Sequence, residues 1–142
     1  PDAHAAFQAA ATERLAKLVP EAKRGQLHRK ELVRERPDLM VGAIACGDTV
    51  GAAEAFGSAL KRQRNRNLMA LEMESGGLLA AVHAKADLSR TLVIRGISDC
   101  SDERKKELDR IGAGALRRYA MGNAIELLWQ LLELGALPRH SS

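Results

Sequence analysis

Hydrophobic residues recur every three or four positions in some segments and form short continuous runs in others. The first spacing is typical of helices that bury one face, and short runs of β-branched residues between turn residues are typical of strands. Helical spacing occurs at residues 3–18, 52–62, 75–86 and 108–132. Short apolar runs occur at residues 39–45, 68–73 and 91–97. Strands that alternate with helices predict an α/β domain with a largely parallel sheet flanked by helices.

The first helix is predicted to end at Pro20, because proline has no amide hydrogen to continue the helical ladder. The apolar face of this helix would be formed by Phe7, Ala11, Leu15 and Leu18. Residues 19–37 are basic and have little periodicity, so a short helix and an exposed connection both remain open.

Two further helices have recognisable ends. Ser75 can cap a helix that runs to about Ala86. Its inward-facing residues would be Leu78, Leu79 and Val82. The last helix is predicted to cover one face of the sheet and to stop at Gly135 and Pro138. Its apolar stripe consists of Leu108, Ile111, Ala115, Tyr119, Gly122, Ile125, Trp129 and Leu132.

Length and composition favour one soluble globular domain over residues 1–142. Hydrophobic residues make up 46% of the chain and charged residues 28%, and no apolar run is long enough to cross a bilayer. Two cysteines, Cys46 and Cys100, are too few for a disulfide framework, which favours a reducing, cytoplasmic location. The four histidines lack metal-ligand spacing, so no metal site is predicted.

The net charge of +4 raises the question of nucleic-acid binding. The basic residues gather at 23–36 and 61–66, and neither segment contains an aromatic side chain on which a base could stack. Solvated helix ends and loops are therefore favoured over a nucleic-acid interface.

Each predicted strand ends in a polar cluster. In open α/β sheets, ligands bind beyond the carboxyl ends of the strands. The three clusters contain Cys46, Asp48 and Thr49; Glu72, Met73 and Glu74; and Ser98, Asp99 and Asp102. Carboxylates accept hydrogen bonds from sugar hydroxyls and ring N–H groups and repel phosphate. The site would therefore favour an uncharged, hydroxyl-bearing ligand.

Three motifs in order, GAIACGDTV, LEMESGG and VIRGISDCSD, resemble the signature of the nucleoside phosphorylase and nucleosidase superfamily. That superfamily includes purine nucleoside and uridine phosphorylases and the methylthioadenosine/S-adenosylhomocysteine nucleosidases. The motif-bearing region covers residues 39–134. The resemblance implies a three-layer α/β/α fold, assembly into homo-oligomers, and cleavage of the N-glycosidic bond of purine nucleosides.

The resemblance also implies a role for each matching residue. Glu74 would accept hydrogen bonds from the ribose 2′ and 3′ hydroxyls, and Met73 would pack against the ribose. Asp99 would protonate the purine at N7 as general acid, and Ser98 would orient its carboxylate. Protonating the base suits a reaction whose transition state is an oxocarbenium-like sugar.

The Gly-Asp loop after the first strand completes the implied site and departs from the family pattern. Cys46 replaces the usual Ser, Asp48 matches the family's Asp, and Val50 stands where an aromatic residue often stacks on the base. No cofactor is implied, apart from phosphate as a co-substrate in a phosphorylase.

Residues 1–38 do not resemble the front half of the family, which carries either a phosphate-binding loop or a water-activating Glu. The chain, which begins at Pro1, is therefore expected to be the C-terminal part of a longer protein, truncated at its N-terminus. Hydrolysis and phosphorolysis both remain open. The alternative function is a catalytically incomplete module that senses a nucleoside or nucleotide within a larger signalling protein.

Structural roles compete with these assignments. Asp99 and Asp102 could be turn or cap residues before the last helix. Glu72 is interpreted as a carboxylate that stabilises a helix start, whereas Glu74 is assigned to the ligand. Cys46 and Cys100 are interpreted as small buried residues and not as nucleophiles.

Overall fold

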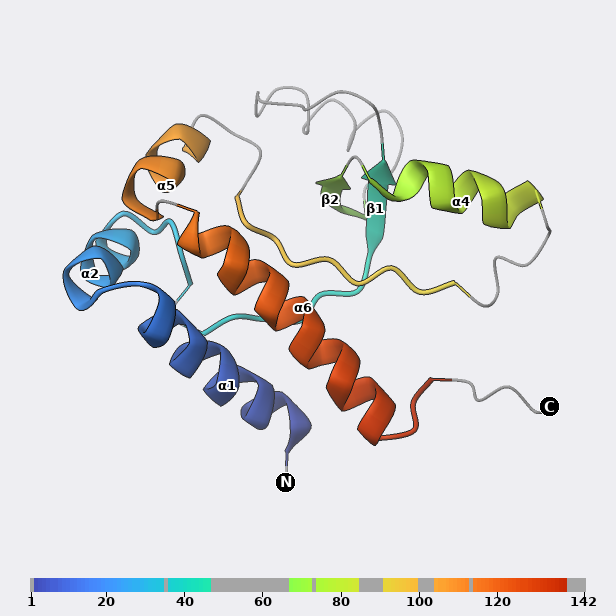
Figure 1. The fold of residues 1–142 in the computed structure, drawn as a ribbon, viewed down its shortest axis with the longest axis horizontal. Helices are drawn as coiled ribbons and strands as arrows, with labels where there is room; N and C mark the ends of the chain where they lie inside the picture. The colour runs from blue at the N-terminus through green and yellow to red at the C-terminus, as the bar shows by residue number, and fades with distance from the viewer. Residues whose placement is uncertain are drawn as a thin grey trace. The chain divides into compact units, whose positions relative to one another are not determined.

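The computed structural model describes residues 2–34, 36–46, 67–72, 74–84, 91–99, 104–112 and 114–137. The chain divides into two compact units. Unit 1 consists of Pro1–Asp38, Ile94–Ser98 and Lys106–Ser142, and unit 2 of Leu39–Val93 and Asp99–Lys105. The described residues form five helices and a two-stranded parallel sheet (Figure 1). The chain is therefore a mixed α/β protein.

Helix α1 spans Ala3–Leu18, as predicted. It begins after Asp2, whose carboxylate accepts a hydrogen bond from the His4 amide at 3.0 Å and so satisfies one free N–H of the first turn. The helix ends at Val19, which is extended (φ −126°, ψ 121°) because the ring of a following proline disfavours helical geometry. The predicted inward residues Phe7, Ala11 and Leu15 are buried.

Helix α2 spans Glu21–Arg29 and decides the question left open for the basic segment. It starts directly after Pro20, whose carbonyl accepts hydrogen bonds from the amides of Lys23 and Arg24. Leu27 is its one fully buried side chain. A short helix thus forms where periodicity is weak, because a single apolar residue anchors it in the core.

The predicted last helix is two helices, α5 (Lys105–Gly112) and α6 (Ala115–Glu133). Gly114 precedes α6 with φ 79°, a left-handed conformation that other residues rarely adopt. A Cβ at Gly112 would lie 2.8 Å from Leu116 Cγ, so glycine also permits the tight approach of the two helices. The prediction of one continuous helix was wrong because two glycines break it.

The predicted stop of α6 at Gly135 is confirmed. Gly135 has φ 63°, its amide donates to the Leu132 carbonyl at 3.1 Å, and the Ala136 amide donates to the Leu131 carbonyl at 2.9 Å. This pair of hydrogen bonds is a Schellman motif, which satisfies carbonyls that the helix leaves free at its C-terminus.

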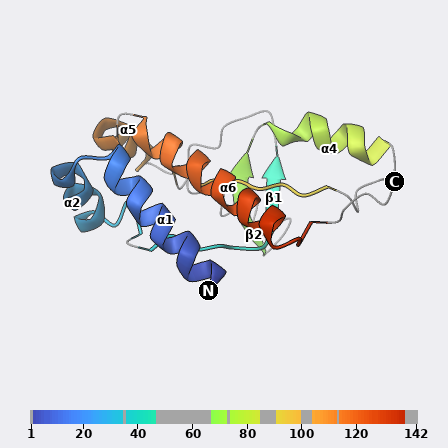
Figure 2. The ribbon, with the colours of Figure 1, turned by 60° about the horizontal axis from the view of Figure 1, so that its bottom comes forward.

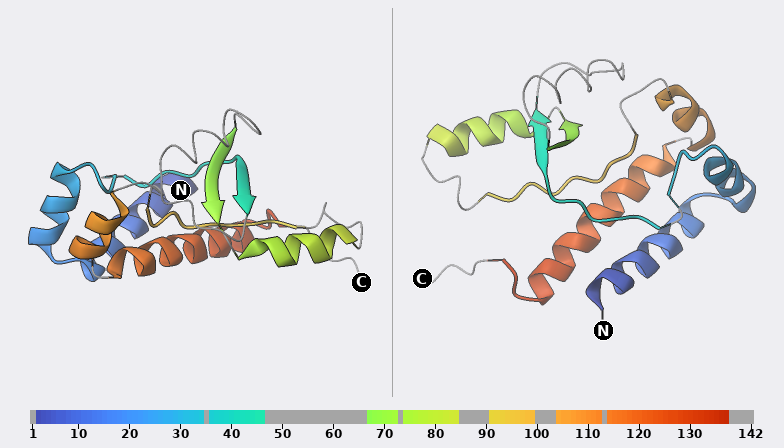
Figure 3. Two further views of the ribbon diagram at one scale, coloured as in Figure 1. Left: turned by 90° about the horizontal axis from the view of Figure 1, so that it is seen from above. Right: turned by 180° about the vertical axis from the view of Figure 1, so that it is seen from behind.

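Helices α1 and α6 lie side by side in opposite directions and form the centre of unit 1 (Figures 1 and 3). Arg14 of α1 reaches α6, where it donates to Asn123 Oδ1 at 2.6 Å and to Glu126 Oε2 at 3.1 Å. Lys30, directly after α2, forms an ion pair with Glu107 of α5. The core cluster contains Ala11, Leu15, Val19, Leu27, Leu108, Ile111, Ala115, Leu116 and Tyr119.

The apolar stripe predicted for the last helix therefore divides. Its first half is buried in the core formed with α1 and α2, whereas Ile125, Trp129 and Leu132 are exposed. The stripe was predicted to cover the sheet, but its buried part packs on helices. The prediction missed this because helical spacing does not distinguish between a sheet and another helix as the packing partner.

The third predicted strand, at residues 91–97, is not a strand. Residues 91–99 are extended but form no ladder. Within unit 1, Gly96 lies directly against the backbone of Ala120 in α6, so closely that a Cβ there would collide with the Ala120 carbonyl. Leu92 and Ile97 of this run are exposed, so the run is not the buried strand that its composition predicted.

Unit 2 contains β1 (Ala43–Cys46), β2 (Leu68–Glu72) and α4 (Ser75–Ala84). The two strands are parallel, and Cys46 pairs with Glu72 at their carboxyl ends (Figure 2). The first strand begins four residues later than predicted, and Val41 before it is fully exposed. Leu78 of α4, predicted to face inward, is also exposed. The helix predicted at 52–62 lies outside the described residues.

Candidate functional site

The parallel pairing of β1 and β2 brings two of the predicted polar clusters together. Cys46 is the last residue of β1 and Glu72 the last of β2, and they are direct partners in the ladder. Helix α4 starts three residues after Glu72. The strand ends and the helix start thus form one local cluster within unit 2.

Glu72 is the centre of this cluster, and its side chain is only 5% exposed. One carboxylate oxygen accepts from the Glu74 amide at 2.9 Å, and the two oxygens accept from the Ser75 amide at 3.1 and 3.0 Å. The Ser75 hydroxyl donates to the same carboxylate. The carboxylate therefore satisfies free N–H groups at the start of α4, and its interpretation as a helix-start residue is confirmed.

Two opposing effects act on the pKa of Glu72. Burial favours the neutral acid and raises the pKa, whereas the hydrogen bonds donated by Cys46, by Ser75 and by the Glu74 amide stabilise the carboxylate. The hydrogen bonds prevail and lower the pKa to about 2 from an ordinary value of 4.5. Glu72 is thus ionised at neutral pH and is no candidate for a general acid.

A pH-dependent contribution to the stability of α4 follows. Because the folded-state pKa is below the unfolded value, the contribution is complete above about pH 4.5 and is lost as the pH falls towards 2. Glu72→Gln should speed hydrogen exchange of the α4 amides at pH 7, because it lowers the free energy of opening the helix by about 1–3 kcal/mol. The difference from the unmodified protein should shrink as the pH falls through this window.

The control for this variant is Glu13→Gln, which removes an exposed carboxylate paired with Lys17 at 2.6 Å. Such exposed ion pairs contribute little to stability, so hydrogen exchange of the α4 amides should not change. The role assigned to the Glu72 carboxylate would be contradicted if the difference in α4 hydrogen exchange between the Glu72→Gln variant and the unmodified protein stayed constant from pH 7 to pH 2.5.

Cys46 is held as a neutral thiol. Its pKa is raised, first by the hydrogen bond that the thiol donates to the Glu72 carboxylate and then by burial. A Cβ at Gly76 would lie 2.9 Å from the Cys46 sulfur, so the glycine at the start of α4 permits close contact. A neutral thiol is a weak nucleophile, which agrees with the interpretation of Cys46 as a packing residue.

Glu74 differs from Glu72 although only one residue separates them. It lies in the turn between β2 and α4, its amide donates to Glu72, and its side chain is exposed. The backbone of Glu74 is thus anchored, and the residue is exposed. Within this turn, the structure distinguishes a buried structural carboxylate from an accessible one.

The other predicted site residues fall in three groups. Ser98 and Asp99 lie at the end of the extended segment 91–99 and are half-buried, and Asp99 belongs to unit 2, as Glu74 does. Asp48, Val50 and Met73 lie outside the described residues. Cys46 lies at the end of β1, and its thiol donates a hydrogen bond to the Glu72 carboxylate.

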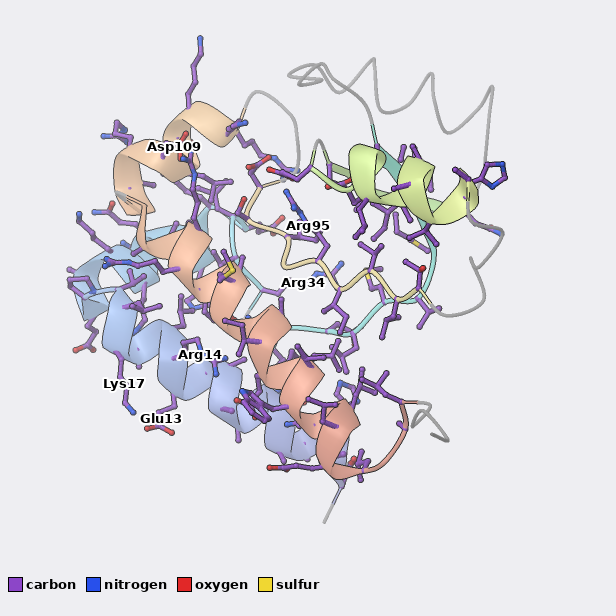
Figure 4. The ribbon with its side chains drawn as sticks, turned by 45° about the vertical axis from the view of Figure 1, so that its right-hand side comes forward. Glu13, Arg14, Lys17, Arg34, Arg95 and Asp109 are labelled. Atoms are coloured by element: carbon purple, nitrogen blue, oxygen red, sulfur yellow. The ribbon has the colours of Figure 1, made fainter. Side chains whose placement is uncertain are left out.

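A second, unpredicted feature is a shallow hollow of about 280 Å³ in unit 1, lined by Ala10, Glu13, Arg14, Lys17 and Glu126. Figure 4 shows Arg14 between α1 and α6, with Glu13 and Lys17 beside each other on α1. Arg14 pairs with Glu126 at 3.1 Å and Lys17 with Glu13 at 2.6 Å. Since each cation already has an anionic partner, the hollow offers no unmatched charge to a ligand.

The part of the chain that the structure describes contains neither a metal site nor a helix that could span a membrane. There, no three His, Cys, Asp or Glu side chains cluster closely enough to bind a metal ion. None of the described helices combines the length and apolar character that a bilayer-spanning segment requires.

Comparison with known proteins gave no match to a protein-family model, to a curated protein or to a solved structure.

Proposed function

We propose that this chain forms part of a protein that cleaves the N-glycosidic bond of purine nucleosides, as a nucleosidase or a nucleoside phosphorylase. The observation that carries the proposal is the junction of β2 and α4. There the Glu72 carboxylate caps the helix, and Glu74 is an exposed residue whose amide donates to that carboxylate. This is the arrangement that a carboxylate needs if it is to receive a ligand at the carboxyl end of a strand.

In this proposal, Glu74 binds the sugar. An exposed carboxylate can accept hydrogen bonds from two neighbouring hydroxyls at once, which suits the 2′ and 3′ positions of ribose. Its anchored amide limits backbone movement, so less entropy is lost on binding. Met73 and Val50 are proposed to contact the sugar and base, and Asp48 and Cys46 to shape the loop beside them.

Asp99 is proposed as the general acid. It follows an apolar segment and is half-buried. Protonation of the purine at N7 turns the base into a better leaving group while positive charge develops on the sugar. Ser98 would orient the acid.

The same proposal extends to the fold, the oligomeric state and the cellular location. A three-layer phosphorylase-like sheet, a homo-oligomeric state and a cytoplasmic location are expected if the resemblance of the three motifs reflects common descent. No cofactor is needed, and phosphate would serve only as a co-substrate.

The test is release of free base from adenosine, methylthioadenosine and inosine by the full-length protein, with and without phosphate, measured by chromatography. Release without phosphate would identify a nucleosidase, and release only with phosphate a phosphorylase. Calorimetric binding without release would favour the nucleoside-sensing module. Neither binding nor release with any of the three nucleosides would contradict the proposal.

A further inference from the structure

Helix α6 has two apolar faces that point in opposite directions. One face is buried in unit 1 and includes Ala115, Leu116, Tyr119 and Ala120. The other is an exposed stripe that consists of Met121, Ile125, Leu128, Trp129 and Leu132. At about 100° per residue, the centres of the two faces are separated by roughly 200° around the helix axis. The stripe therefore lies opposite the α1 contact.

The exposure of this stripe is unusual for a surface helix. Its five side chains are 40–64% exposed, and they include Trp129, the only tryptophan of the chain. A helix that is apolar on nearly all sides is normally buried on all sides. An apolar patch of this kind is typical of surfaces that bind another protein, a membrane or a ligand.

Charged residues at the two ends of the stripe indicate what covers it. Arg118 precedes the stripe and Glu133 follows it, fifteen residues later, or about 22 Å along the helix. Both side chains are exposed, and neither makes an ion pair with another described residue. By contrast, the two neighbouring charges on α6 are satisfied, Arg117 by Asp109 at 3.4 Å and Glu126 by Arg14 at 3.1 Å.

We propose that the stripe binds the same stripe of a second copy, with the two α6 helices antiparallel about a two-fold axis. In this arrangement Met121 lies opposite Leu132 of the other copy, and Ile125 opposite its Leu128. The Arg118 end of each helix then lies beside the Glu133 end of the other, so both unmatched charges gain a partner of opposite sign. A self-complementary surface of this kind is what a two-fold dimer requires.

Sedimentation velocity between 1 and 200 µM tests this surface, because a helix pair of this size should dissociate in the micromolar range. Ile125→Glu should weaken the dimer about 100-fold, since it places a charge in the apolar seam. Val41→Glu is the matched control, because Val41 is fully exposed and lies outside α6. Trp129 emission should shift to the blue as concentration rises.

Charge reversal separates this geometry from other dimers. Arg118→Glu and Glu133→Arg should each weaken the dimer about 10-fold, because each creates two like-charge contacts, and the double variant should restore it. A protein that stays monomeric at 200 µM would overturn the proposal, as would a dimer indifferent to Ile125→Glu. Trp129 emission that is blue-shifted at every concentration would show that the chain covers the stripe itself, which also overturns it.

Discussion

Asp99→Asn is expected to lower the rate of base release from purine nucleosides by about 10²–10⁴-fold, the usual contribution of a positioned general acid. The amide keeps the shape of the carboxyl group but cannot supply a proton to N7. The Michaelis constant should change much less, because the sugar contacts assigned to Glu74 remain. Steady-state kinetics with adenosine-type nucleosides, together with the pH dependence of kcat, would measure both effects.

Asp109→Asn is the matched control for this change. Asp109 lies on α5, half exposed, where it pairs with Arg117 at 3.4 Å (Figure 4). Loss of this carboxylate should leave the rate of base release within about twofold of that of the unmodified protein, because exposed ion pairs contribute little to stability. Base release that survives Asp99→Asn unchanged would remove Asp99 from the mechanism, even if the protein proved to be a nucleosidase.

Gly96→Ala is expected to destabilise unit 1 by about 1–3 kcal/mol, a large effect for one methyl group. The added Cβ would collide with the Ala120 carbonyl of α6, and backbone on both sides must move to relieve the overlap. Urea unfolding followed by Trp129 emission reports on this unit directly, because Trp129 is on α6. The urea concentration at the midpoint of unfolding should fall, with little change in the dependence of the unfolding free energy on urea concentration.

Gly25→Ala supplies the comparison within the same unit. Gly25 is inside α2, and a Cβ there would meet only the flexible end of Arg29, at 3.2 Å. Alanine is a better helix former than glycine, so this variant should be more stable by about 0.5–1 kcal/mol. If the two variants have equal midpoints, the close contact between residue 96 and α6 does not exist in solution.

Local features of the chain were predictable because they depend on neighbours in sequence. The bounds of α1 follow from its helical spacing and from Pro20, and the end of α6 follows from Gly135. The carboxyl end of β2 and the start of α4 follow from the apolar run at 68–73 and from Ser75. In each case the interactions that decide the structure join residues fewer than six positions apart.

The candidate site was predictable in part. Its composition at the ends of the strands, and the separate roles of Glu72 and Glu74, could be argued from the sequence. The hydrogen bond from the Cys46 thiol to the Glu72 carboxylate could not be predicted, because it depends on the register between two strands that are distant in the chain. The signal that could have found it is the expectation that parallel strands align their carboxyl ends.

The sequence alone determined α1, the start of α4, the end of α6 and the α/β class, since these follow from short-range hydrogen bonds and hydrophobic spacing. Only the tertiary structure decided that the run at 91–97 forms no strand and that Gly96 within it lies against α6. It alone showed that α6 buries one apolar face and exposes another. Hydrophobic spacing says that a face must be covered, but the identity of the covering surface depends on contacts between residues far apart in the chain.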